Sequence, residues 1–236
     1  MIFRSEFTVN THDTDFNGEL RPGRLLAYMQ ETANLQLQEM HPSNDELRAR
    51  GLSFVLSRIA INQYHPIFAC NTIEVQTWAC ESKGLLTTRC YRVLRDGEIA
   101  AEALSVWGLL DLESRRPVRV SEVGSDYSPE QQLELDLPRR FVIPSDAQLH
   151  LVGEHTVSYA ETDKNMHMNN TCYPDMFCDY LDLAECRPAS ILINYNTEAP
   201  KGSTLKIYMA QYDGCYFFRS VRPDGKVNAE ARFILD

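Results

Sequence analysis

Three polar residues at alternate positions, in the stretch Thr162 to Asn170, carry side chains that could do chemistry together. Asp163, Asn165 and His167 are each separated by one residue, so an extended or turning backbone would project all three to one side. A carboxylate offers a base or a nucleophile, an amide offers a neutral orienting group, and an imidazole changes charge near neutral pH. We therefore expect this stretch to form the centre of a site.

Each of these residues also has a structural interpretation. Asp163 could cap a helix or form a turn, Asn165 could be a turn residue, and His167 could be a satisfied polar residue at a helix start. His155 and Cys172 lie nearby in the sequence and would suit a cysteine-histidine mechanism. A thiolate nucleophile needs an identifiable base and a defined placement, and the sequence shows neither.

The stretch belongs to the second of two related segments. Residues 8–17 read TVNTHDTDFN and residues 156–165 read TVSYAETDKN, so both begin with Thr-Val and share Thr-Asp-x-Asn at the same offset. Glu19 takes the place of His167 in the first segment. Because Thr-Asp-x-Asn occurs twice, we expect it to have a structural role in both copies, and we expect the second copy to be the active one.

A predicted helix and several predicted strands follow each segment. Apolar residues recur at helical spacing, which predicts a helix with one buried face in each copy. The two stripes are Leu26, Met29, Ala33, Leu37 and Met40, and Tyr173, Met176, Phe177, Tyr180, Leu181 and Ala184. The strand-like segments are 57–64, 73–79, 85–94 and 99–110 in the first half, and 191–196, 205–210, 216–221 and a last strand ending at Leu235 in the second. An Asp-Gly turn precedes the last strand of each half.

Two copies of one strand-helix-strands unit predict an α+β protein made of two tandem hotdog folds. In each fold a long helix would be wrapped by an antiparallel sheet, which leaves an apolar cleft large enough for an acyl chain. We expect the domains to span residues 1–122 and 154–236. The charged, proline-punctuated segment 123–153 is predicted to be a surface linker.

Composition argues against several classes of function. The chain has 236 residues, 44% of them apolar, and a formal charge of −10, which disfavours binding to nucleic acid or to an anionic membrane surface. We find neither a secretion signal nor an apolar run of roughly 18 to 20 residues that could span a membrane, so we expect a cytoplasmic protein. Seven cysteines without a C-x-x-C pair predict reduced, packed thiols rather than disulfides or a zinc site.

Three motifs are more specific than composition. They are Asp163-Lys-Asn165-Met-His167-Met-Asn169-Asn170-x-x-Tyr173, the run Phe54 to Arg58, and Ser105-x-Trp107 together with Arg115-Arg116-Pro117. The first is similar to the D-x-N-x-H-x-N-N-x-x-Y signature of the acyl-acyl carrier protein thioesterases of plants and bacteria, which are tandem hotdog proteins. With all three motifs, the chain resembles this family over nearly its whole length.

The resemblance implies hydrolysis of fatty acyl-acyl carrier protein thioesters, which releases free fatty acid and ends chain elongation. It implies no metal or other cofactor, and its partner would be an acyl carrier protein bearing a phosphopantetheine-linked acyl chain. It places Asp163, Asn165 and His167 in catalysis, with a later acid that falls on Glu198. Some plant members have a cysteine after that acid, but Ala199 stands here and excludes a cysteine mechanism at that place.

We expect the Asp163 carboxylate to act as a nucleophile or as the base that activates water, with Glu198 as a second carboxylate. Asn165 and His167 would orient the reacting groups, and backbone N–H groups at the following helix start would polarise the thioester carbonyl. The first copy has Pro66 in place of Glu198 and is expected to contribute the acyl pocket. Its substrate-binding residues are predicted to be Met29, Ala33 and Leu37.

Two other functions stay open at this point. The same fold could serve a non-catalytic acyl-binding or regulatory protein, or a thioesterase that acts mainly on coenzyme A thioesters. Surface arginines near the linker are either a solvated face or a docking patch for an acidic carrier protein; they are Arg115, Arg116, Arg139 and Arg140. The sequence is compatible with a monomer or a homodimer, and it does not specify the acyl chain length.

Overall fold

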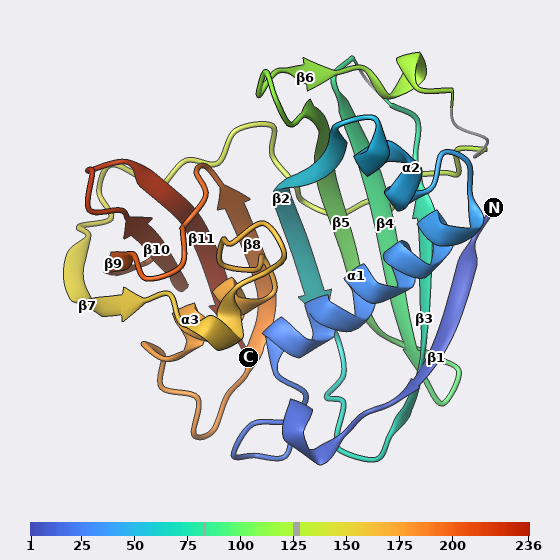
Figure 1. Cartoon of the computed structure of the whole chain (residues 1–236). Helices are drawn as coiled ribbons and strands as arrows, with labels where there is room; N and C mark the ends of the chain where they lie inside the picture. Colours follow the sequence, from blue (N-terminus) through green and yellow to red (C-terminus); the bar gives the residue numbers. More distant parts are fainter. Residues whose placement is uncertain (83, 125–127) are drawn as a thin grey trace. The chain divides into compact units, whose positions relative to one another are not determined.

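The computed structural model describes residues 1–82, 84–124 and 128–236, and it divides the chain into two compact units, Met1–Asp136 and Leu137–Asp236 (Figure 1). The division falls inside the predicted linker. The predicted boundaries at 122 and 154 stay predictions, and strand β7 already begins at His150. No helix among the described residues is both long and apolar enough to cross a membrane.

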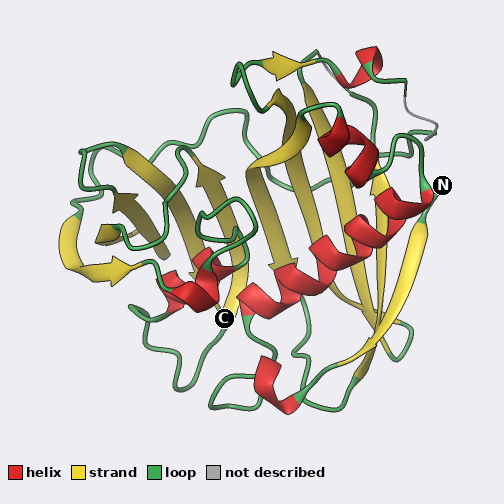
Figure 2. Ribbon diagram, viewed as in Figure 1, coloured by secondary structure: helices red, strands yellow, loops and turns green. Residues whose placement is uncertain are grey.

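The first unit is an antiparallel sheet with one long helix on one of its faces (Figure 2). The sheet order is β1-β3-β4-β5-β2, and β6 pairs with β5. The helices are η1 (Thr11–Asp13), α1 (Pro22–Glu39), α2 (Asn44–Ala49) and η2 (Val120–Glu122). The strands are β1 (Phe3–Thr8), β2 (Leu52–Gln63), β3 (Thr72–Ala79), β4 (Leu86–Arg95), β5 (Glu98–Asp111) and β6 (Pro117–Val118).

The buried face of α1 is partly polar. Leu26, Met29 and Ala33 of the predicted stripe are buried, but the face then continues through Thr32 and Gln36. Gln36 is stabilised there because its Oε1 accepts a hydrogen bond of 2.6 Å from Arg89 Nη1 on β4. The helix ends at Glu39, and the predicted stripe residues Leu37 and Met40 are half-buried.

The second unit repeats the plan with a short helix. Its elements are β7 (His150–Thr156), η3 (Tyr159–Glu161), α3 (Cys172–Cys178), β8 (Pro188–Tyr195), β9 (Thr204–Tyr212), β10 (Cys215–Val221) and β11 (Val227–Leu235). The strands are antiparallel in the order β8-β11-β10-β9-β7. Phe177 of α3 stacks on Phe218 with ring centroids 4.9 Å apart and meets Phe233 edge-on at 6.2 Å, so an aromatic cluster anchors the helix.

The second helix is shorter than the apolar stripe predicted. The stripe continues to Ala184, but α3 ends at Cys178 and Ala184 is exposed. Tyr180 N–H and Leu181 N–H donate to carbonyls three residues back, at 3.2 and 3.0 Å, which tightens the chain after the helix. Beyond that, the Asp182 carboxylate accepts a hydrogen bond from Ala184 N–H at 3.3 Å. Such local bonding by aspartate favours a turn over a continued helix.

Candidate active site

The motif residues of the second unit form a closed turn, Thr162–Met168, which we call the second motif turn. The Asp163 carboxylate organises it, since its Oδ1 accepts hydrogen bonds from Asn165 N–H at 2.8 Å and His167 N–H at 3.2 Å. Asp163 N–H donates to the His167 carbonyl at 2.9 Å. Met166 has a φ of 64°, a left-handed conformation that a residue with a Cβ rarely adopts. One carboxylate oxygen of Asp163 is therefore a structural part of the turn.

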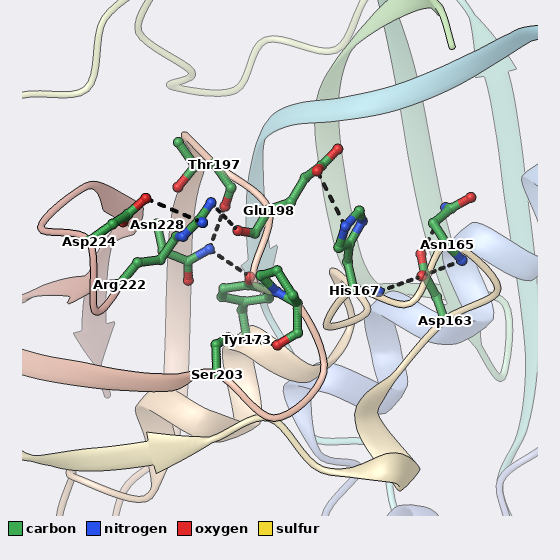
Figure 3. Close-up of polar contacts among 11 residues, drawn as sticks. Asp163, Asn165, His167, Tyr173, Thr197, Glu198, Ser203, Arg222, Asp224 and Asn228 are labelled. Atoms are coloured by element: carbon green, nitrogen blue, oxygen red, sulfur yellow. Dashed lines mark hydrogen bonds and ion pairs between the residues drawn. The ribbon is translucent and has the colours of Figure 1, made fainter. Parts of the chain in front are cut away.

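The motif side chains form two pairs (Figure 3). Asn165 Nδ2 donates to Asp163 Oδ2 at 3.1 Å. The imidazole of His167 is directed at Glu198, and its Nε2 lies 3.3 Å from Glu198 Oε2. The three side chains that we expected on one face therefore fall into separate pairs. Asp163 pairs with Asn165, and His167 pairs with Glu198. The backbone of the turn connects the two pairs, because Asp163 Oδ1 accepts a hydrogen bond from His167 N–H.

Backbone pairing carries Glu198 to the motif. An isolated β-bridge joins His167 to Pro200, and Met168 N–H donates to the Ala199 carbonyl at 2.8 Å. The His167 side chain is 23% exposed and that of Glu198 is 47% exposed. Main-chain contacts therefore hold the backbones of His167 and Glu198 together, while the Glu198 carboxylate stays accessible to solvent.

The helix start does not offer the free N–H groups that we expected to polarise the thioester carbonyl. Thr171 N–H donates to Asn169 Oδ1 at 3.0 Å. Cys172 N–H donates to the Asn169 carbonyl at 2.9 Å, and Tyr173 N–H donates to the Asn170 carbonyl at 3.4 Å. Two asparagines of the motif satisfy these donors, so the prediction is wrong for these three N–H groups.

The first unit contains the same turn at Thr14–Leu20, the first motif turn. Asp15 Oδ1 accepts hydrogen bonds from Asn17 N–H at 2.8 Å and Glu19 N–H at 3.1 Å, and Gly18 is left-handed with a φ of 77°. The bridge from Glu19 to Phe68 matches the bridge from His167 to Pro200.

These matching bridges also locate the counterparts of the second pair. Pro66 lies two residues before Phe68, and Glu198 lies two residues before Pro200, so Pro66 is the counterpart of Glu198. The alignment of the two sequence segments gave the same result. Where His167 meets Glu198 in the second unit, Glu19 accepts a hydrogen bond of 2.9 Å from Gln63 Nε2 in the first. The turn is common to both units, and the imidazole-acid pair occurs in the second.

Family models match both halves of the chain. The acyl-ACP thioesterase N-terminal domain matches residues 1–126, and the acyl-ACP thioesterase C-terminal domain matches residues 145–234. The chain belongs to the acyl-ACP thioesterase family. The first motif turn lies in the range matched by the N-terminal domain, and the second lies in the range matched by the C-terminal domain.

Curated members of the family are distant relatives in sequence. The chain is 27% identical over 191 residues to oleoyl-acyl carrier protein thioesterase 2, chloroplastic, of Arabidopsis thaliana, covering 72% of this chain and 52% of the relative. It is 25% identical over 193 residues to a chloroplastic palmitoyl-acyl carrier protein thioesterase of Cuphea hookeriana, covering 73% and 45%. The chain thus spans about half the length of the curated relatives it matches.

Solved acyl-ACP thioesterases share the fold over the whole chain. An acyl-ACP thioesterase from Bacteroides thetaiotaomicron superposes with a TM-score of 0.90 at 24% identity, covering 100% of this chain and 98% of that one. The 12:0-ACP thioesterase from Umbellularia californica gives a TM-score of 0.79 at 18% identity, with coverages of 100% and 97%. The predicted α+β class with two tandem hotdog folds is confirmed.

The other predicted site residues of this acyl-ACP thioesterase family member lie on helix α1 and in exposed segments of the two units. Met29 and Ala33 are buried on α1 and Leu37 is half-buried, and their role in an acyl pocket stays a prediction. The four arginines of the predicted docking patch are exposed; Arg115 and Arg116 belong to the first unit, and Arg139 and Arg140 belong to the second.

A cysteine-histidine mechanism gains no support. His155 Nε2 lies 2.7 Å from Glu161 Oε1, and the Cys172 thiol contacts the Glu161 main-chain carbonyl at 3.9 Å. The imidazole is therefore engaged by a carboxylate.

Sequence reasoning missed the buried polar residues behind Glu198. Asn228 on β11 and Ser220 on β10 are fully buried, and Asn228 bonds to Tyr173 of the motif. A signal was present in the repeat, because Asn228 stands directly before Ala229-Glu230-Ala231, whereas the first copy has Ala100 before Ala101-Glu102-Ala103. Comparing it with the matching strand of the first unit would have exposed the difference.

Proposed function

We propose that the protein hydrolyses the thioester of fatty acyl-acyl carrier protein, releasing free fatty acid and ending chain elongation. Family membership supports the reaction class. One observation carries the assignment to the second unit: His167 Nε2 lies 3.3 Å from Glu198 Oε2 beside the Asp163 turn, and the same turn in the first unit has Glu19 and Pro66 at the two positions.

Asp163 is the proposed reacting carboxylate. Its Oδ1 is held by two backbone N–H groups, so Oδ2 is the oxygen that would face the thioester. Acting as a nucleophile, Oδ2 would attack the carbonyl carbon, expel the thiolate and form a mixed anhydride that water then hydrolyses. Acting as a base, it would take a proton from the water that attacks the same carbon.

The remaining residues would position these groups. Asn165 Nδ2 donates to Asp163 Oδ2 and would fix the carboxylate plane. Glu198 would hold the imidazole of His167 in one orientation, with Nε2–H toward the carboxylate, and the ring would then align water or the thioester. The acyl chain would occupy a pocket lined by Met29, Ala33 and Leu37, and the arginines 115, 116, 139 and 140 would dock the carrier. Location in the cytoplasm and oligomeric state stay predictions.

The deciding experiment measures thiol release from acyl-acyl carrier protein with a thiol-reactive dye, alongside binding of the same substrate. Turnover supports the proposal, whereas binding without release would identify a non-catalytic acyl-binding protein. Comparing the carrier and coenzyme A thioesters of one acyl chain tests the partner. Reversing the charge of the four arginines should weaken the carrier reaction more than the coenzyme A reaction, because coenzyme A has phosphates but lacks the acidic protein surface.

A labelling experiment tests the nucleophilic role of Asp163. In a single turnover in H₂¹⁸O, a nucleophilic carboxylate acquires ¹⁸O when the anhydride is hydrolysed at the aspartyl carbon, and mass spectrometry of the motif peptide detects it. Label in the peptide therefore establishes the nucleophilic role, whereas a general base, like an anhydride that water attacks at the acyl carbon, puts the label only in the fatty acid.

A further inference from the structure

A fully buried asparagine lies behind the segment that carries Glu198. Asn228 is 0% exposed, and its Nδ2 donates hydrogen bonds to the Tyr173 hydroxyl at 3.0 Å and to the Thr197 carbonyl (Figure 3). Its Oδ1 accepts a hydrogen bond from Ser220 Oγ at 2.9 Å. One carboxamide therefore connects α3, the loop before Glu198 and strand β10.

This connection reaches Glu198 through the adjacent peptide groups. The Thr197 carbonyl is held by Asn228, and the Glu198 carbonyl accepts a hydrogen bond from Arg222 Nη1 at 3.0 Å. Arg222 is itself held by Asp224, with Nη2 to Oδ2 at 3.3 Å. Two consecutive main-chain carbonyls are thus fixed, and the side chain that leaves between them points at His167.

The interior position makes this arrangement specific. Burying a carboxamide is unfavourable unless its donors and acceptor are all bonded, and Asn228 bonds on both sides of its amide. Buried networks of this kind favour a single arrangement of the groups they join. Burial raises the pKa of the Tyr173 hydroxyl to about 12, so the phenol stays protonated at neutral pH.

Among the described residues of the first unit, the equivalent positions do not form this network. Tyr64 N–H and His65 N–H donate to the Ala100 carbonyl just as Asn196 N–H and Thr197 N–H donate to the Asn228 carbonyl, so Ala100 corresponds to Asn228. By the strand register, Val93 corresponds to Ser220, and by the motif offset Leu25 corresponds to Tyr173. Apolar residues fill this place in the unit that has Pro66 instead of Glu198.

We propose that Asn228 is a positioning residue, which acts through Thr197 and Tyr173 to hold Glu198 within reach of His167. The inference rests on the proposed function, because it assumes that the Glu198–His167 pair serves thioester hydrolysis. Misplacing a catalytic group by about 1 Å can lower turnover about 100-fold. The effect should fall on kcat, since Asn228 is buried and does not touch substrate.

A double-mutant cycle tests the proposal. Asn228→Ala should lower kcat by roughly 10- to 100-fold with little change in KM, and in a Glu198→Ala background the same substitution should change kcat by less than about 2-fold. Losses that multiply in the double variant would overturn the inference alone. Near-normal turnover of Glu198→Ala by itself would overturn the proposed site, and this inference with it.

Two further variants guard against a simple folding defect. Tyr173→Phe removes one hydroxyl and keeps the ring, so it tests the same contact if Asn228→Ala fails to fold. Tyr173→Phe should also lower kcat, and it should leave kcat unchanged in the Glu198→Ala background. Gln76→Ala removes another buried carboxamide, on β3 of the first unit, and should lower thermal stability while leaving kcat unchanged. Equal losses of kcat in Gln76→Ala and Asn228→Ala would overturn the positioning role.

Discussion

The two motif turns have the same backbone and different side chains where chemistry is proposed. In both, an aspartate carboxylate accepts two main-chain N–H groups and a β-bridge holds the residue four positions later. The second turn then presents His167 to Glu198, whereas the first presents Glu19 to Gln63. The turn is therefore a structural frame, and an Asp-x-Asn pattern alone does not mark an active site.

The interiors of the two units differ in a related way. Beneath α1, which has 18 residues, the buried face includes the polar pair Gln36 and Arg89. Beneath α3, which has 7 residues, the core is an aromatic cluster around Phe177. The polar network of the second unit lies instead behind Glu198. Each unit therefore places its buried polar groups at a different end of the helix-sheet interface.

The largest expected contrast comes from changing the matched aspartates. Asp163→Asn should lower kcat by about 10³-fold, because the amide keeps Oδ1 as an acceptor for the turn but removes the charge and the reacting oxygen. Asp15→Asn should leave kcat almost unchanged. Initial rates with saturating acyl-carrier substrate, together with circular dichroism melts, check both. Similar losses in the two variants would break the assignment of chemistry to the second unit.

The next contrast compares the residues four positions after the two aspartates, His167 and Glu19. His167→Ala should lower kcat by about 10²-fold, because the group that Glu198 orients is removed. Glu19→Ala should keep turnover but cost roughly 1 kcal/mol of unfolding free energy, since Gln63 Nε2 loses the shorter of its two hydrogen bonds and keeps the one to the His65 carbonyl. Steady-state kinetics and urea titrations measure the two effects. If Glu19→Ala lost as much turnover as His167→Ala, the first turn would also take part in the chemistry.

Acid sensitivity should be shared by the two units, because a half-buried acid precedes each turn. Burial alone would raise the pKa of Asp13, but hydrogen bonds from Tyr28 and Asn10 and the charge of Arg24 lower it overall. Burial would likewise raise the pKa of Glu161, but hydrogen bonds from Ser158 and the neighbouring His155 lower it overall.

A depressed folded-state pKa means that each carboxylate stabilises the fold above its unfolded pKa and loses this contribution as pH falls through the folded value. Unfolding free energy should therefore fall as the pH drops below the ordinary pKa values of 4.5 for Glu161 and 3.8 for Asp13. Asp13→Asn and Glu161→Gln should each reduce that loss in urea titrations at pH 6 and pH 3. An unchanged acid loss in both variants would contradict the shared role.

The smallest contrast concerns the left-handed positions of the turns. Met166 carries the conformation with a side chain at a cost of about 1 to 2 kcal/mol, and glycine would relieve it while adding unfolded-state entropy. Met166→Gly should therefore raise the free energy of unfolding by about 0.5 kcal/mol, and Gly18→Met should lower it by a similar amount. Paired thermal melts measure the difference. Destabilisation by Met166→Gly would show that the methionine side chain makes contacts that outweigh the strain.

The repeat, the fold class and the place of the motif followed from the sequence because they depend on patterns that local residues create. The end of α3 did not, since Ala184 continues the apolar stripe and only the turn around Asp182 shows that the helix has stopped. The occupied N–H groups after Asn169 also escaped prediction, because they depend on where two asparagine acceptors lie. Asn228 is distant from the motif in sequence, and strand register alone brings it to Thr197.

The backbone bridges of the motif turns have a consequence for protein engineering. Main-chain atoms hold residues 162–168 and 199–200 together. The side chains of these residues can therefore be exchanged while the backbone of the turn is kept. Transplanting a working site into the first unit would need more than Glu19→His and Pro66→Glu. The graft would also have to bring Leu25→Tyr, Val93→Ser and Ala100→Asn, so that the loop under the new glutamate is held as firmly as the original.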